Sequence, residues 1–175
     1  MKLFAPLITL KRHADALAAH AVAPFALGLR AYVADVFLKS GWLKLASFDN
    51  TLYLFREEYH VPLLPPDVAA VAGTAGELGL GALVLLGLGG RLSAFGLFCV
   101  NLMAVVSYKH VLFAEGFEAA LGDHWLWGTI LAVLVVHGPG RWSADMLIGS
   151  LAGRFGARSA QAEPSRWHAS TDECT

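Results

Sequence analysis

Residues 68–90 read VAAVAGTAGELGLGALVLLGLGG, and only one of these side chains, Glu77, is charged. A helix needs about 20 mostly apolar residues to cross roughly 30 Å of bilayer hydrocarbon. This stretch meets that requirement, and three others at 21–45, 92–108 and 121–137 have a similar apolar character. The sequence therefore predicts an all-α integral membrane protein in which four spanning helices form one bundle.

The overall composition agrees with a membrane location. Hydrophobic residues make up 56% of the chain and charged residues 15%, whereas a soluble domain is about 25% charged. Four buried helices of a soluble bundle would each need a polar face, which these stretches lack. A net charge of -1 provides no basic surface for nucleic acid. We therefore expect the lipid bilayer as the surroundings and no nucleic-acid partner.

Three parts of the chain differ in character: an amphipathic N-terminal segment at 1–20, the membrane domain at 21–150 and a polar cytoplasmic tail at 151–175. In the loop between the first two stretches, Leu52, Phe55 and Tyr59 have helical spacing. This spacing predicts a short interfacial helix that ends before the prolines at 62–66. The segments 8–22 and 142–155 also have mixed faces and are expected to lie along the inner interface.

Lysine and arginine counts predict the orientation, because cytoplasmic loops carry an excess of these residues. With the N-terminus inside, four lie in the outer loops: Lys39, Lys44, Arg56 and Lys109. Eight lie in the inner segments: Lys2, Lys11, Arg12, Arg91, Arg141, Arg154, Arg158 and Arg166. We therefore expect a multi-pass protein of the cell membrane with both termini cytoplasmic. In a cell with two membranes, this is the inner membrane.

Arg30 and Glu77 are the charges that most need an explanation, because a charge near the bilayer centre is costly and is by default a functional or pairing residue. Arg30 lies about 14 Å from the inner end of the first stretch, and Glu77 about 14 Å from the outer end of the second. These depths predict an ion pair between the two helices. Such a pair either ties the helices together or faces a pocket. Lys44 points to nearly the same side as Arg30 and is expected to reach the outer interface.

Histidines form a second candidate constellation at the outer interface. His110 ends the third stretch and His124 begins the fourth, with Tyr108 and the loop residue His60 nearby. None of the spacings matches a metal-ligand motif such as HExxH, so no metal site is predicted. His110, His124 and Tyr108 remain candidate contacts for a ligand or a quinone. Asn101, in the middle of the third stretch, is expected to form a hydrogen bond between helices.

Several short motifs together resemble the DoxX family of small four-helix membrane proteins. They are Gly28-Leu29-Arg30, the run from Phe37 to Leu45 with Gly41-Trp42-Leu43-Lys44, Glu77-Leu78, the run from Leu85 to Arg91, and Gly138-Pro139-Gly140-Arg141-Trp142-Ser143-Ala144-Asp145. The resemblance covers residues 22–150. Two positions depart from the family pattern: Gly90 stands where a threonine is frequent, and the ending SLD is replaced by Ser143-Ala144-Asp145.

The resemblance implies an accessory subunit of a membrane redox system that is quinone-linked or concerned with oxidative stress. It favours this role over that of an enzyme acting by itself. The implied partners are a membrane redox enzyme or a peptide-modifying system, and the implied ligand is a quinone. Arg30, Lys44 and Glu77 match polar positions of the family and form the candidate intramembrane site. Two alternatives remain open: a small transporter in which Glu77 binds a proton or cation, and an assembly or scaffold factor for another membrane protein.

Overall fold

The computed structural model describes residues 5–161 and is all-helical over that range. In chain order the helices are α1 (Ala5–Ala46), α2 (Phe48–Glu57), α3 (Pro66–Leu86), α4 (Gly90–Ser107), α5 (Lys109–Leu112), α6 (Glu118–His137) and α7 (Ala144–Gln161). Four helical segments are long and apolar enough to cross a membrane: His20–Ala46, Pro66–Leu86, Gly90–Ser107 and Glu118–His137. The predicted all-α membrane bundle is confirmed.

Helix ends follow local sequence. Pro66 occupies the first turn of α3, where its missing N–H costs nothing. Gly87 ends that helix in the left-handed conformation with φ 69°, and the N–H of Leu88 donates to the carbonyl of Leu83 at 2.9 Å. At the end of α6, Gly138 has φ 84° and Pro139 follows it. Gly87 allows the sharp reversal from α3 into α4, and Gly138 ends α6 before the connection to α7.

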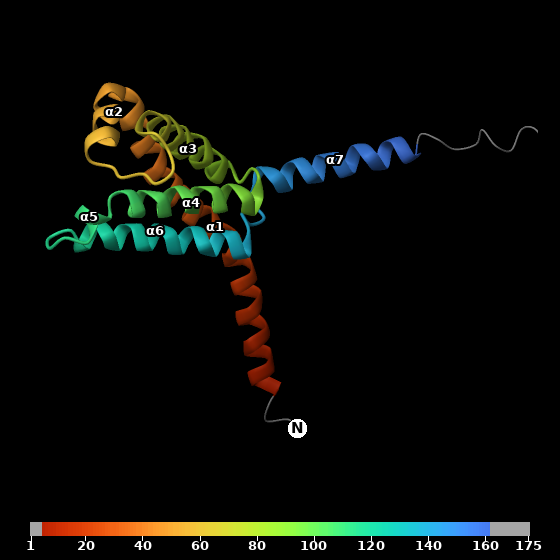
Figure 1. Ribbon diagram of the computed structural model, residues 1–175. Coiled ribbons are helices and arrows are strands. Elements are labelled where there is room, and N and C mark those ends of the chain that lie inside the picture. Colours follow the sequence, from red (N-terminus) through yellow and green to blue (C-terminus); the bar gives the residue numbers. More distant parts are fainter. Residues whose placement is uncertain (1–4, 162–175) are drawn as a thin grey trace, which may run out of the picture.

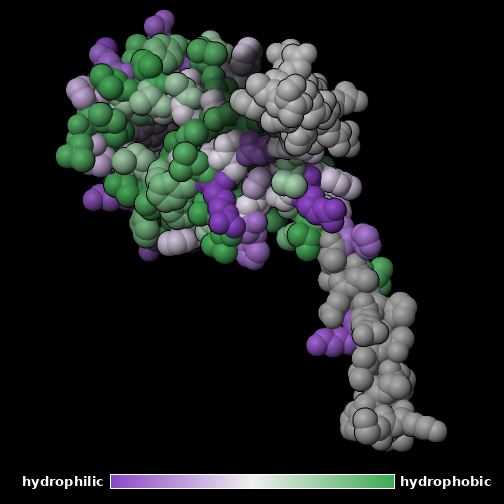
Figure 2. Space-filling view, turned by 90° about the vertical axis from the view of Figure 1, so that its right-hand side faces the viewer, coloured by the Kyte–Doolittle hydropathy of each residue, from purple (hydrophilic) through white to green (hydrophobic). Residues whose placement is uncertain are grey.

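The bundle consists of two antiparallel pairs, α1 with α3 and α4 with α6, and α3 also packs on α4 (Figure 1). All four spans contribute to one apolar core, whose buried members are Val33, Phe37, Val84, Ala94, Leu97, Ile130, Leu131 and Leu134. Many large apolar side chains instead point outward along the bundle, among them Leu92, Phe95 and Val136. Figure 2 looks at the end where α7 leaves the bundle and shows hydrophilic side chains gathered there beside broad hydrophobic surfaces.

Glycines set the register of α1 against α3. A Cβ added to Gly41 would lie 2.8 Å from the Leu78 side chain, and one added to Gly81 would lie 3.2 Å from Leu38. The backbones therefore approach closely at these points, as expected for small residues between membrane helices. Gly41 is level with Glu77 and Leu78, so Lys44 lies one turn beyond Glu77. At the other end of the seam, Gly87 is level with Arg30.

The predicted short helix in the first loop is confirmed as α2, which packs its Phe55 against Ala69 and Ala70 of α3. We call this the α2 end of the bundle and the opposite end the α7 end. Before the bundle, α1 runs without interruption from Ala5 through the expected boundary at residue 20 and projects away from it (Figure 1). Helix α7 extends to Gln161, beyond the segment 142–155 expected to be amphipathic. The remainder of the expected tail, 162–175, lies outside the described residues.

Candidate functional site

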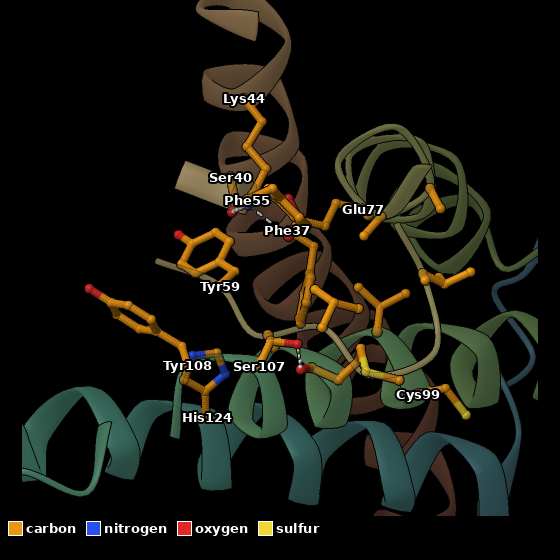
Figure 3. A pocket seen from close by; sticks show the side chains of 18 of the residues that line it. Phe37, Ser40, Lys44, Phe55, Tyr59, Glu77, Cys99, Ser107, Tyr108 and His124 are labelled. Atoms are coloured by element: carbon orange, nitrogen blue, oxygen red, sulfur yellow. Dashed lines mark hydrogen bonds and ion pairs between the residues drawn. The ribbon is translucent and has the colours of Figure 1, made fainter. Parts of the chain in front are cut away.

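A cavity of about 470 Å³ lies between the helix pairs toward the α2 end (Figure 3). Most of its wall is apolar, and α1, α2, α3, α4, α6 and the loop after α2 all contribute. The lining residues are Val36, Phe37, Ser40, Lys44, Phe55, Tyr59, Val61, Leu64, Ala69, Ala72, Gly73, Glu77, Cys99, Val100, Met103, Ala104, Ser107, Tyr108, His124 and Trp127. This volume and this mixture of an apolar wall with few polar groups are typical of small-molecule sites.

An ion pair between Lys44 and Glu77 is part of the cavity wall. The Lys44 Nζ donates to Glu77 Oε1 at 2.8 Å, to Glu77 Oε2 at 2.7 Å and to Ser40 Oγ at 2.7 Å. The exposed fractions of the Lys44 and Glu77 side chains are 20% and 9%. Because three bonds occupy all the hydrogens of the ammonium, Lys44 is fully satisfied within the protein. The pair adds no net charge to the cavity.

Ser40 lies one turn before Lys44 on α1, and its hydroxyl oxygen accepts the third ammonium hydrogen. In the described part of the chain, the Ser40 hydroxyl hydrogen has no acceptor. A hydroxyl that accepts a charge-assisted bond becomes a stronger donor, because hydrogen bonds in a chain polarise one another. Ser40 therefore offers a polarised O–H to whatever occupies the cavity. Ser40 was not among the site residues predicted from the sequence, although its spacing of four from Lys44 was a usable signal.

The predicted ion pair between Arg30 and Glu77 is wrong. Arg30 is only 3% exposed, but its Nη1 donates to the carbonyl of Pro139 at 2.9 Å and its Nη2 to that of Trp142 at 2.7 Å. Arg30 thus binds the connection between α6 and α7, at the α7 end and away from the cavity lining. Its Nε is buried without a hydrogen-bond partner among the described residues.

The depth estimate for Arg30 failed because it placed the inner end of the first span at residue 21. Residues 20–29 extend past the end of α3, and Arg30 is level with Gly87, the residue that terminates α3. Ten residues separate Glu77 from Gly87, which is about 15 Å along a helix. That distance is far beyond the reach of an ion pair. Glu77 is paired with Lys44, which the sequence analysis expected at the interface.

The predicted hydrogen bond of Asn101 between helices is confirmed, and its partner is His124. Asn101 Nδ2 donates to the backbone carbonyl of His124 at 3.0 Å, and Asn101 Oδ1 lies 2.9 Å from His124 Nδ1. Because Oδ1 can only accept, Nδ1 carries the hydrogen. In the neutral ring, Nε2 is then the acceptor. Asn101 therefore joins α4 to α6 and fixes the tautomer of a histidine that lines the cavity.

Aromatic rings cover the cavity at the α2 end. Phe55, Tyr59 and Tyr108 stack edge to face, with successive ring centroids 4.9 and 5.0 Å apart. Burial raises the pKa of Tyr59 above its usual value, and the nearby Tyr108 and Glu77 raise it further. Tyr59 therefore stays protonated and can donate a hydrogen bond throughout the physiological pH range.

His110 does not line the cavity. Its ring packs against His60 and Tyr108, with centroid distances of 5.0 and 5.4 Å. Of the three residues named as candidate ligand contacts, His124 and Tyr108 line the cavity. Over residues 5–161, no group of three His, Cys, Asp or Glu side chains is arranged to hold a metal ion.

Comparison with known families gives one match: the DoxX family model matches residues 25–110. Of the residues proposed from the sequence, that range includes Arg30, Lys44, Glu77, Tyr108 and His110. It ends before His124 and before the stretch from Gly138 to Asp145. Comparison with curated proteins and with solved structures finds no match.

Proposed function

The chain is a membrane protein of the DoxX family, and we propose that it acts as an accessory subunit of a membrane redox system by holding a quinone-type lipid in its cavity. The observation that carries this proposal is an apolar cavity of about 470 Å³ with a neutral ion pair and a free hydroxyl donor on one wall. A quinone has an uncharged ring, carbonyl oxygens that need donors, and a long apolar tail. Each of these features has a counterpart in the cavity.

The donors suit a carbonyl oxygen better than an ion. Glu77 neutralises the Lys44 ammonium, so neither charge is free to bind an ion. An anion or cation that entered the cavity would lose its hydration and gain no opposite charge in return. Ser40, polarised by Lys44, and Tyr59, held protonated, both offer O–H groups. This donor set favours a neutral acceptor and argues against Glu77 as a free cation site.

The proposal sets the protein in the cell membrane with both termini cytoplasmic, so that the α2 end and the cavity lie toward the outer side. The excess of lysine and arginine in the segments assigned to the inside supports this orientation. The redox partner is then a membrane enzyme, or a peptide-modifying system, that exchanges the lipid with this subunit. In a variant with Cys99 and Cys174 replaced by Ser, a cysteine introduced at exposed Leu63 should react with an impermeant maleimide added outside intact cells.

The direct test is extraction of lipids from protein purified in mild detergent, followed by mass spectrometry for quinones. We expect a quinone to copurify with the natural protein. Replacement of Ser40 by Ala should lower the retained quinone about fivefold. The matched control is Ser93→Ala, because Ser93 is also a serine of a spanning helix but is buried outside the cavity lining.

Two results would overturn the proposal. One is the absence of any quinone combined with an unchanged quinol-linked respiration rate when the protein is deleted. The other is equal retention of quinone by the Ser40→Ala variant and the natural protein. A specific membrane protein captured without any bound small molecule would instead favour the assembly-factor alternative.

A further inference from the structure

The two helices α3 and α4 approach closely at Gly76 and Gly96, toward the α7 end. A Cβ on Gly76 would lie 3.2 Å from the Val100 side chain, and one on Gly96 would lie 3.1 Å from Leu80. Toward the α2 end, Ala72 of α3 and Ala104 of α4 line the cavity instead. The helices therefore leave a gap that begins just beyond the Gly76–Val100 contact. We call this the α3–α4 gap.

Residues at the α3–α4 gap line the cavity and are also exposed on the side of the bundle. Met103 is 41% exposed, and Ala72 and Cys99 are exposed as well. The labelled Cys99 side chain lies at the edge of the cavity in Figure 3. Since α3 and α4 are both spanning helices, this side of the bundle faces lipid. The cavity is therefore open laterally to the bilayer.

The α2 end is more firmly covered. The backbone N–H of His60 donates to the carbonyl of Ser107 at 2.9 Å, and Arg56 binds Asp67 through two bonds of 2.7 and 2.9 Å. These contacts tie α2 and the following loop to the ends of α4 and α3. A second hollow of about 340 Å³ lies beyond this cover and shares Phe55, Tyr59, Val61 and Leu64 with the cavity. Those four side chains form a partition between the cavity and the α2 surface.

We infer that the α3–α4 gap is a lateral entrance through which a tailed amphiphile enters from the bilayer, with its head near Ser40 and its tail in the gap. This inference rests on the proposed function and adds the route and the class of ligand. The gap offers the uncharged side chains of Ala72, Cys99 and Met103, which suit an alkyl or isoprenoid chain. The charged pair and the Ser40 hydroxyl lie on α1 and α3, on another part of the cavity wall. If the head of the amphiphile enters first, its tail therefore stays in apolar surroundings, either in the bilayer or in the gap.

The experiment compares two probes in detergent micelles by calorimetric titration: decylubiquinone, which carries a ten-carbon tail, and the same dimethoxy-methyl-benzoquinone ring without a tail. Ala72→Phe and Cys99→Phe place a ring in the gap from either helix. Val71→Phe and Leu92→Phe are the matched controls, because both positions are exposed on the same helices and do not line the cavity. Size-exclusion chromatography selects the variants that fold.

We expect each gap variant to weaken decylubiquinone binding at least tenfold and to change binding of the tailless ring less than twofold. Both control variants should bind both probes like the natural protein. If one gap variant does not fold, the other decides. Unchanged decylubiquinone affinity in a folded gap variant would overturn the entrance and indicate access from the α2 end. An equal loss of affinity for both probes would also overturn the proposed entrance. If the natural protein binds neither probe, the proposed function itself fails.

Discussion

Each end of the bundle holds one cation, half-buried Lys44 or buried Arg30, and the two cations have different partners. At the α2 end, Lys44 meets a carboxylate, and the pair lines a cavity. At the α7 end, Arg30 meets two backbone carbonyls in a tightly packed corner, where Gly87 has no room for a side chain. A Cβ there would overlap Arg30 Nη1. The comparison indicates that Arg30 connects segments of the chain, whereas Lys44 lies beside a cavity large enough for a ligand.

The largest effect should come from breaking the Lys44–Glu77 pair on one side only. Glu77→Leu leaves the ammonium without its carboxylate, and we expect a loss of about 4 kcal/mol in the free energy of unfolding. The double variant Lys44→Met with Glu77→Leu should recover to within about 1 kcal/mol of the natural protein. Detergent-induced unfolding followed by circular dichroism measures both. A double variant as unstable as the single one would show that the pair has a net stabilising role.

The Arg30 corner should show the next largest effect on stability. Arg30→Met removes two charge-assisted hydrogen bonds, and we expect a loss of about 3 kcal/mol. The folded fraction should retain quinone at the natural level, because Arg30 does not line the cavity. Arg91→Met, at an exposed arginine of the same end, is the control and should be nearly neutral. Reduced quinone in folded Arg30→Met protein would contradict the proposed separation between the two ends.

A smaller coupling is expected between Asn101 and His124. In a double-mutant cycle of Asn101→Leu, His124→Phe and both together, the interaction energy should be about 1 kcal/mol, which is usual for hydrogen bonds between membrane helices. Thermal unfolding in one detergent measures all four proteins. Additive effects, with no coupling, would mean that the side-chain bond between α4 and α6 does not form.

The smallest effect should come from the exposed pair of Arg56 and Asp67, whose side chains are 53% and 58% exposed. Exposed pairs contribute little to stability, since water and salt screen them. Arg56→Gln should leave the unfolding midpoint unchanged within error at moderate salt. A clear loss of stability would show that the cover at the α2 end depends on this ion pair more than on its apolar packing.

Much of the fold could be predicted from the sequence because hydropathy reports burial in lipid directly. The four spans, the short helix around Phe55 and the role of Asn101 all depend on local spacing and composition. The partner of Glu77 depends on helix register, which the side chains facing Gly41 and Gly81 decide. Arg30 and Lys44 lie fourteen residues apart on α1, which is about 21 Å along the helix. The boundaries of the spans alone did not give the register needed to choose between them.

The cavity itself was beyond sequence reasoning. It exists because α3 and α4 diverge from the contact of Gly76 with Val100 toward the α2 end. The packing of several helices together determines this divergence. Tyr59 becomes relevant as a donor only once that space is known, whereas the spacing of Ser40 from Lys44 was visible in the sequence. Tyr108 and His124 were named from their position in the chain, and they line the cavity. His110 was named on the same grounds and lies outside the lining.

The near-complete cancellation of charge between Lys44 and Glu77 has a consequence for an energised cell. A membrane potential of 100 mV does work of about 2.3 kcal/mol on one elementary charge moved across the bilayer. It does almost no net work on two opposite charges that move together. Loading and release of an uncharged lipid beside this pair should therefore proceed equally well in polarised and depolarised membranes.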